Sequence, residues 1–256
     1  MIDELCDDLL AERAGLMTLL TPLDEGDWLT STPAPDWSIL DQVTHLAFFD
    51  EAARTAILEP ESFIAQRAEA MEDVDGFVDR VTKSQRHLGG VDALPWLEHA
   101  GAAFVGSARY ADAKVRTPWY GPDMSLASMI TSRIMETWAH GQDVRDALGV
   151  RAESSPCLRH VAFLGWRAVA NSFLARGRPV PAEAVRVELD ECTFGPDDAV
   201  NVVRGPALDF CLVVTQRRHP DDTSLVAEGP VAQEWLTIAQ AYAGPPGAGR
   251  ERGQFS

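Results

Sequence analysis

The chain has 256 residues, of which 46% are hydrophobic and 24% are charged, which is the balance of a globular protein with enough apolar surface for a core. No apolar run approaches the roughly 20 residues that span a bilayer, and the N-terminal stretch is acidic where a signal peptide would be basic, so we expect a cytoplasmic protein that binds no membrane. The formal net charge of −17 repels phosphate backbones and argues against nucleic-acid binding.

The first two thirds of the chain are predicted to be helical. Leucines at helical spacing indicate a helix over residues 2–21, and a loop rich in proline, threonine and aspartate follows it. Ser38, with Asp41 three residues later, predicts the N-cap of a second helix that continues to Pro60. Further helices are predicted within the segments 61–88 (one broken helix or two short ones), 95–112, 125–149 and 155–177.

The sequence changes character at residues 175–184, where two prolines and a glycine predict a linker. Beyond it, alternating apolar residues predict strands at 185–191, 199–205 and 223–229. Helices are predicted to begin at Pro206 and Pro230. The predicted fold class is therefore α+β, in three parts: a helical domain over residues 1–176, a small α+β domain over residues 183–245, and a mobile tail over residues 246–256.

One predicted helix carries a polar stripe that can hold a metal ion. Glu136 and His140 are four residues apart, so they share one face of the helix. Arg133 lies one turn before them and Asp143 one turn after. A histidine from a facing helix, such as His45, would complete the three protein ligands of an open catalytic site. One carboxylate and two imidazoles suit zinc, and would also hold nickel, cobalt, manganese or iron(II).

Ordinary structural roles compete with this interpretation. A Glu and a His at this spacing are usually a solvated pair on a helix surface, and an isolated histidine such as His45 is usually an ordinary helix residue. The four cysteines form no CxxC motif, which excludes a zinc ribbon or a thioredoxin-type site. They are interpreted as small buried side chains.

Three features together resemble the mycothiol-dependent maleylpyruvate isomerases. They are the DWS segment that leads to His45, the R-x-x-E-x-x-x-H-x-x-D segment from Arg133 to Asp143, and the small C-terminal α+β domain. The resemblance implies a DinB-like up-down four-helix bundle with the metal ligands His45, Glu136 and His140. It also implies mycothiol as a cosubstrate, in an actinobacterial cytosol.

The implied chemistry is thiol-linked. A metal ion lowers the pKa of a bound thiol or water and so generates a nucleophile at neutral pH. A thiolate can add reversibly to an activated double bond and allow rotation, or it can displace a leaving group. The predicted function is a metal-dependent enzyme that uses a low-molecular-weight thiol for isomerisation of, or transfer to, a small electrophilic, acidic substrate.

Two further sets of residues are predicted to contact the substrate or the thiol. In the family an arginine of the C-terminal domain points to the active site, and the corresponding residue here would be Arg217 or Arg218, which would bind a carboxylate. The competing interpretation is a solvated helix end, where cations favour the helix dipole. Aromatic residues are predicted to wall the pocket, with ordinary packing as the competing interpretation: Trp37, Trp138 and, in the loop before the ligand helix, Trp119 and Tyr120.

The sequence is also compatible with two other functions. One is a metal-dependent hydrolase or lyase of a natural-product or catabolic intermediate, in which no thiol takes part and Asp143 or Asp41 is the base. Either aspartate could also orient a ligand imidazole. The other is a non-catalytic metal-binding module, which would be closed by four protein ligands. Three ligands without an obvious fourth favour an enzyme, acting as a monomer or homodimer.

Overall fold

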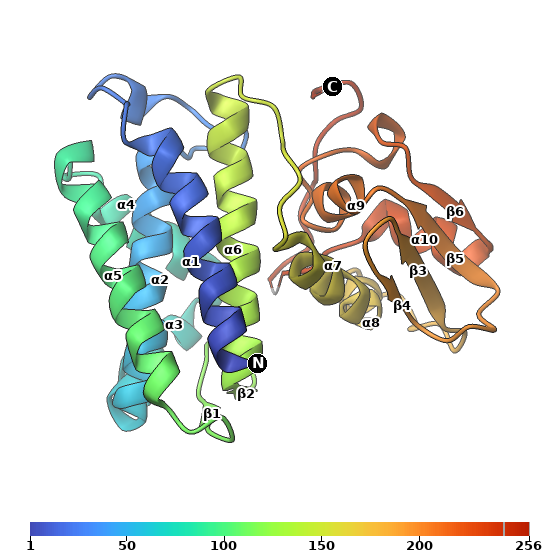
Figure 1. Cartoon of the computed structure of the whole chain (residues 1–256), viewed down its shortest axis with the longest axis horizontal. Helices are drawn as coiled ribbons and strands as arrows, with labels where there is room; N and C mark the ends of the chain where they lie inside the picture. Colours follow the sequence, from blue (N-terminus) through green and yellow to red (C-terminus); the bar gives the residue numbers. More distant parts are fainter. Residues whose placement is uncertain (243, 256) are drawn as a thin grey trace. The chain divides into compact units, whose positions relative to one another are not determined.

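The computed structural model describes residues 1–242 and 244–255, and it leaves out the side chains of Glu69, Val74 and Asp75. The chain divides into two compact units, Met1–Arg151 and Ala152–Ser256 (Figure 1). In the part of the chain that is described, no helix combines the length and the apolar character that a membrane crossing requires.

Four long helices of the first unit form a bundle (Figure 1). Arg109 near the end of α5 pairs with Asp3 and Asp7 at the start of α1, so α1 and α5 are antiparallel. After α2 the chain returns along the bundle through two short helices, α3 and α4. As a result, α2 and α5 run in the same direction (Figure 1). The bundle helices are α1 (Ile2–Leu20), α2 (Ile39–Leu58), α5 (Gly90–Tyr110) and α6 (Leu126–Ala147), and the short ones are η1 (Asp27–Leu29), α3 (Pro60–Glu72) and α4 (Val74–Ser84).

The C-terminal unit is built on a four-stranded sheet of order β4-β3-β5-β6. The central strands β3 and β5 are parallel, with Val187 opposite Val203, and the two outer strands are antiparallel to them. The elements of this unit are α7 (Leu158–Arg167), α8 (Val169–Ala175), β3 (Val185–Leu189), β4 (Thr193–Phe194), β5 (Asn201–Gly205), α9 (Ala207–Val214), η2 (Pro220–Asp222), β6 (Val226–Glu228) and α10 (Pro230–Ile238). The predicted α+β class, a four-helix bundle followed by a small α+β domain, is confirmed.

The two units divide earlier in the chain than the composition suggests. The predicted linker lies at residues 175–184, whereas the compact units divide after Arg151, so α7 and α8 belong to the C-terminal unit. Close packing explains this: a side chain at Gly165 of α7 would collide with Val214 of α9, and the thiol of Cys211 bonds the carbonyl of Leu158. Because such contacts join residues far apart in sequence, local composition does not reveal them.

Two predicted helices differ in extent from the observed ones. The helix expected to begin at Pro95 starts at Gly90, and Pro95 lies inside α5. This early start depends on glycine, because a side chain at Gly90 would collide with the indole of Trp28. The single helix expected over residues 155–177 is broken at Ala168, whose ψ of 3° departs from helical geometry.

An aspartate buried in the bundle joins three of its helices. Asp50 of α2 accepts hydrogen bonds from Arg13 of α1 and from Arg133 of α6, the latter at 2.9 Å from Nε to Oδ1. Arg133 also donates to the carbonyl of Leu46 at 3.2 Å. The three charged residues are 93% or more buried. A charge held in a low dielectric needs such partners, so this cluster ties α1, α2 and α6 to one another.

We expect Asp50→Ala to lower the free energy of unfolding by about 3–5 kcal/mol, because it leaves two buried guanidinium groups without a counter-charge. Urea unfolding followed by circular dichroism measures the change. Asp7→Ala, which removes an exposed partner of Arg109, is the control and should change stability little. Equal effects of the two substitutions would contradict the importance given to the buried cluster.

Candidate metal centre

The first turn of α2 is fixed by a complete capping box. The hydroxyl of Ser38 accepts from the backbone N–H of Asp41, and the Asp41 carboxylate accepts from the Ser38 N–H at 2.8 Å. Arg86 also donates to Asp41, at 2.9 Å and 3.0 Å. The predicted N-cap is confirmed. The sequence allowed Asp41 to orient a ligand imidazole. In the structure the Asp41 carboxylate is instead bonded to Ser38 and Arg86.

The structure brings the three predicted ligands together. Glu136 Oε2 lies 3.1 Å from His140 Nε2 and 3.5 Å from His45 Nε2. The three possible ligand atoms lie within 4.8 Å of one another. A tetrahedral zinc site with bonds of about 2.0–2.1 Å has ligand–ligand distances of about 3.3 Å. The spacing therefore fits a small divalent metal ion bound by α2 and α6.

The electrostatics of the cluster favour its metal-binding protonation states. Burial lowers the pKa of His45 to about 4, the charges of His140 and Arg133 act in the same direction, and Glu136 opposes them. Burial would raise the pKa of Glu136, but hydrogen bonds and charges from His140 and His45 outweigh it and hold that pKa well below its usual value. His45 is therefore neutral and Glu136 ionised near pH 7, as metal ligands must be.

Gln42, which the sequence analysis did not single out, completes the surroundings of His140. Its side-chain carbonyl contacts His140 Nδ1, and its amide donates to the Thr32 hydroxyl at 2.8 Å. A carbonyl only accepts, so Nδ1 carries a proton. In the neutral imidazole that metal binding requires, Nε2 then presents its lone pair on the side of the Glu136 carboxylate. A metal ion here would accept the lone pairs of both atoms, which lie 3.1 Å apart. This arrangement fits a bound metal ion.

The indole ring of Trp37 packs against both imidazoles. Its centroid lies 5.2 Å from that of His45 and 5.9 Å from that of His140, on which it is stacked with an interplanar angle of 15°. The indole N–H donates to Asp79 of α4 at 3.2 Å, which holds the ring in place. Trp37 thus packs against both imidazoles, and its part in walling a substrate pocket stays a prediction.

The loop between β1 (Arg116–Thr117) and β2 (Met124–Ser125) reaches the cluster through one phenyl ring. The Phe49 centroid lies 4.6 Å from that of His45, 6.3 Å from that of Trp119 and 5.6 Å from that of Tyr120. Burial raises the pKa of Tyr120 to about 12, so its hydroxyl stays a neutral hydrogen-bond donor. The two loop aromatics thus extend the aromatic surface that begins at His45, and their contact with a ligand stays a prediction.

Two other predicted residues lie on α6. Asp143 is one turn beyond His140 and is completely buried. Trp138 is also buried, and its position two residues from each α6 ligand turns it to another face of the helix. Among the described residues no ring contact joins Trp138 to the cluster. Their roles in binding or catalysis stay predictions.

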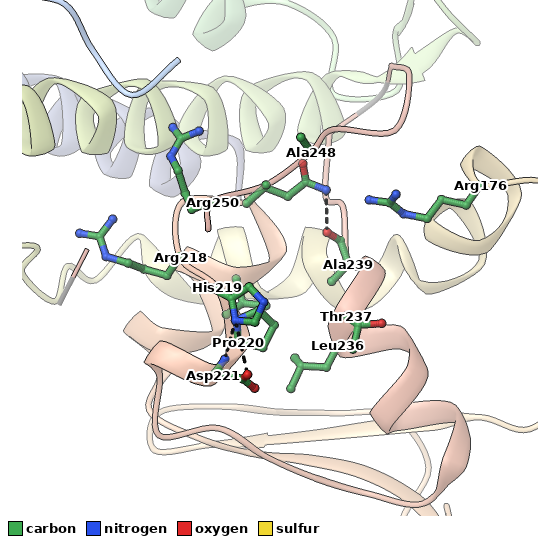
Figure 2. A pocket seen from close by; sticks show the side chains of 13 residues that line it. Arg176, Arg218, His219, Pro220, Asp221, Leu236, Thr237, Ala239, Ala248 and Arg250 are labelled. Atoms are coloured by element: carbon green, nitrogen blue, oxygen red, sulfur yellow. Dashed lines mark hydrogen bonds and ion pairs between the residues drawn. The ribbon is translucent and has the colours of Figure 1, made fainter. Parts of the chain in front are cut away.

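Arg217 and Arg218 follow α9 in the C-terminal unit. Their backbone N–H groups bond the Leu212 carbonyl at 2.7 Å and 3.1 Å, which closes the end of the helix. Arg218 is one of the residues around a cavity of about 170 Å³ (Figure 2). Other polar side chains around that cavity come from Arg176, His219, Asp221 and Arg250. A part for either arginine at the metal cluster stays a prediction.

The chain is an α+β protein in which a helical bundle with a His–Glu–His cluster is followed by a small α+β unit. Residues 9–145 match the family model described as the mycothiol maleylpyruvate isomerase N-terminal domain, and the chain belongs to that family. Two proteins from two strains of Mycobacterium tuberculosis, both described as uncharacterized, are 41% identical over 249 residues, or 95% of this chain and 96% of theirs.

Solved structures share the fold. The crystal structure of the mycothiol-dependent maleylpyruvate isomerase matches with a TM-score of 0.60 and 14% sequence identity, and that of a point mutant with 0.62 and 13%. Each match covers 90% of this chain and 95% of the other. The family resemblance stated from the sequence is thereby confirmed.

We expect the metal-free protein to lose stability as the pH falls from 7 towards 4. The unfolded chain takes up a proton on His45 near pH 6.5, whereas the folded protein does so only near pH 4, so protons favour unfolding in that window. Glu136 adds a further loss below about pH 4.5, because its folded pKa is depressed. Urea unfolding with chelator at several pH values measures the slope.

A His45→Gln variant is the control for this pH dependence. Because glutamine does not titrate, the loss between pH 6.5 and pH 4 should be smaller than in the wild type. Identical slopes in the two proteins would show that His45 is not the responsible group.

Proposed function

We propose that this chain is a metal-dependent enzyme that uses mycothiol, or a similar low-molecular-weight thiol, for isomerisation of, or transfer to, a small electrophilic and acidic substrate. Family membership supports the proposal, as does the shared fold of a protein named as a mycothiol-dependent maleylpyruvate isomerase. The observation that carries it is the open cluster of His45, Glu136 and His140.

The openness of the cluster favours catalysis over a structural role. Among the described residues, no fourth His, Cys, Asp or Glu joins the three ligands. Glu136 is the most exposed of them, at 26%, against 14% for His140 and 9% for His45. A structural zinc site is closed by four protein ligands, whereas a catalytic site leaves a position for water or substrate. The exposed side of Glu136 is where we place the thiol.

A bound divalent metal supplies a Lewis acid that lowers the pKa of a coordinated thiol. His45, Glu136 and His140 would hold it, with zinc as the preferred ion. The rings of Trp37 and Phe49 would exclude water from one side of the cluster and so strengthen its electrostatic interactions.

The remaining roles concern the substrate and its protons. Asp143, one turn from His140, is our candidate for proton transfer. Trp119 and Tyr120 would line the substrate side of the cluster, with Trp138 as a further binding residue, and either Arg217 or Arg218 would bind a carboxylate of the substrate. The thiolate adds to a double bond conjugated to a carbonyl and gives an enolate, in which the former double bond is single. After rotation about that single bond, expulsion of the thiolate restores the double bond and gives the isomer.

We expect the wild-type protein, purified without a polyhistidine tag, to bind about one equivalent of zinc. His45→Ala and His140→Ala should lose it, because each removes one of only three ligands. Plasma mass spectrometry after equilibration with zinc measures the content. His99→Ala, an exposed histidine of α5, is the matched control and should keep the metal. Full zinc content in the His140→Ala protein would exclude the proposed ligand set.

The zinc-loaded protein should isomerise or conjugate electrophilic unsaturated acids, maleylpyruvate among them, only when mycothiol is added, and chelation should abolish the activity. We expect Arg217→Ala or Arg218→Ala to raise KM for an acidic substrate about tenfold or more while the zinc content stays unchanged. Arg178→Ala, which removes an exposed partner of Glu234, is the control. Activity that needs metal but no thiol would instead support a hydrolase or lyase.

A further inference from the structure

The only ligand imidazole with an outer hydrogen-bond partner, among the described residues, is that of His140. Its Nδ1 contacts the side-chain carbonyl of Gln42, which is completely buried. His45 Nδ1 is buried without any hydrogen-bond partner. Metal-binding histidines normally donate their second N–H to such a partner, which sets the tautomer and the ring orientation. Among the described residues, Gln42 is the side chain that accepts such a bond, and it does so from His140.

A chain of hydrogen bonds determines which way the Gln42 amide points. The Thr32 hydroxyl donates to the Trp37 carbonyl at 2.9 Å, so it can only accept from Gln42. Gln42 Nε2 therefore donates to Thr32 at 2.8 Å, and its carbonyl is left to face His140. If the amide were reversed, Thr32 would have to give up the Trp37 carbonyl. The bond from the Thr32 hydroxyl to the Trp37 carbonyl therefore determines the donors of the two bonds that follow it, from Gln42 to Thr32 and from His140 to Gln42.

The loop that contains Thr32 and Trp37 is held in place by backbone hydrogen bonds. Thr32 and Trp37 are joined by a second bond, from the Thr32 N–H to the Trp37 carbonyl at 2.8 Å, and Ile39 N–H bonds the Thr30 carbonyl at 3.0 Å. The same loop presents the Trp37 ring to both imidazoles. One short segment thus sets both the ring that packs on the cluster and the hydrogen bond behind it.

We propose that Gln42, oriented by Thr32, is a positioning residue that keeps the proton of His140 on Nδ1 and so presents Nε2 as the metal ligand. The inference rests on the proposed function, since it concerns the same site. It adds that metal affinity depends on a glutamine that does not itself bind the metal. Gln42 lies one turn before His45 on α2, so one helix supplies a ligand and the support for another.

The test compares the zinc dissociation constants of variants. Some remove the Gln42 carbonyl that faces His140, and others remove only the bond between Gln42 and Thr32. Gln42→Met removes the acceptor at similar volume and should weaken binding by about tenfold to a hundredfold. Gln42→Glu keeps an acceptor but loses the donor to Thr32, and should retain affinity close to that of the wild type. Thr32→Val should show a smaller loss than Gln42→Met. Gln142→Met is the matched control, because Gln142 is a buried glutamine of α6 that bonds Asp146.

A spectroscopic readout reports the hydrogen bond directly. In zinc-loaded protein labelled with ¹⁵N-histidine, the Nδ1 proton of His140 should be protected from exchange in the wild type and in Gln42→Glu, and should exchange rapidly in Gln42→Met. Wild-type affinity and protection in Gln42→Met would overturn the inference and leave the proposed function standing. Equal losses in Gln42→Met and Gln42→Glu would overturn it too, by showing a purely structural role. A wild type that binds no zinc would overturn both.

Discussion

The ion pairs of Asp50 tie together the helices that carry the His45–Glu136–His140 cluster. One carboxylate holds Arg13 and Arg133, and thereby fixes α6 against α2 in depth and in rotation. Glu136 follows Arg133 by one turn of α6, and His45 precedes Asp50 on α2, so the same pairing aligns the ligands. Removing these three charges from water is costly, but their pairing keeps α2 and α6 in the register that brings His45 to Glu136 and His140.

Local sequence signals were sufficient for much of this architecture. The spacing of Glu136 and His140 determines that they share a helix face, and the Ser38 capping box fixes where α2 begins and hence where His45 lies. The alternation in Val185, Val187 and Leu189 likewise matches the buried face of β3. Each of these features depends on residues within a few positions of one another, which a single sequence displays in full.

Features that depend on distant residues could not be predicted from local patterns, and the pairing of His45 with Glu136 and His140 was expected from the family resemblance. Gln42 contacts a histidine 98 positions away, and nothing in its own helix distinguishes it from an exposed glutamine. Arg13 and Asp50 look like surface charges until the fold brings them together. The start of α5 at Gly90 depends on Trp28, and the assignment of α7 to the C-terminal unit depends on α9. In each case tertiary packing overrides a reasonable local preference.

The short hairpin of β1 and β2 separates an exposed loop tip from the helix that carries Glu136 and His140. Two paired positions, Arg116 with Ser125 and Thr117 with Met124, close the loop immediately before α6 begins. The tip between them, residues 121–123, is exposed. Mutations there can accumulate with little effect on the ligand helix, because the paired base absorbs changes in the length and conformation of the tip. The sequence of this tip can therefore vary while His45, Glu136 and His140 are kept.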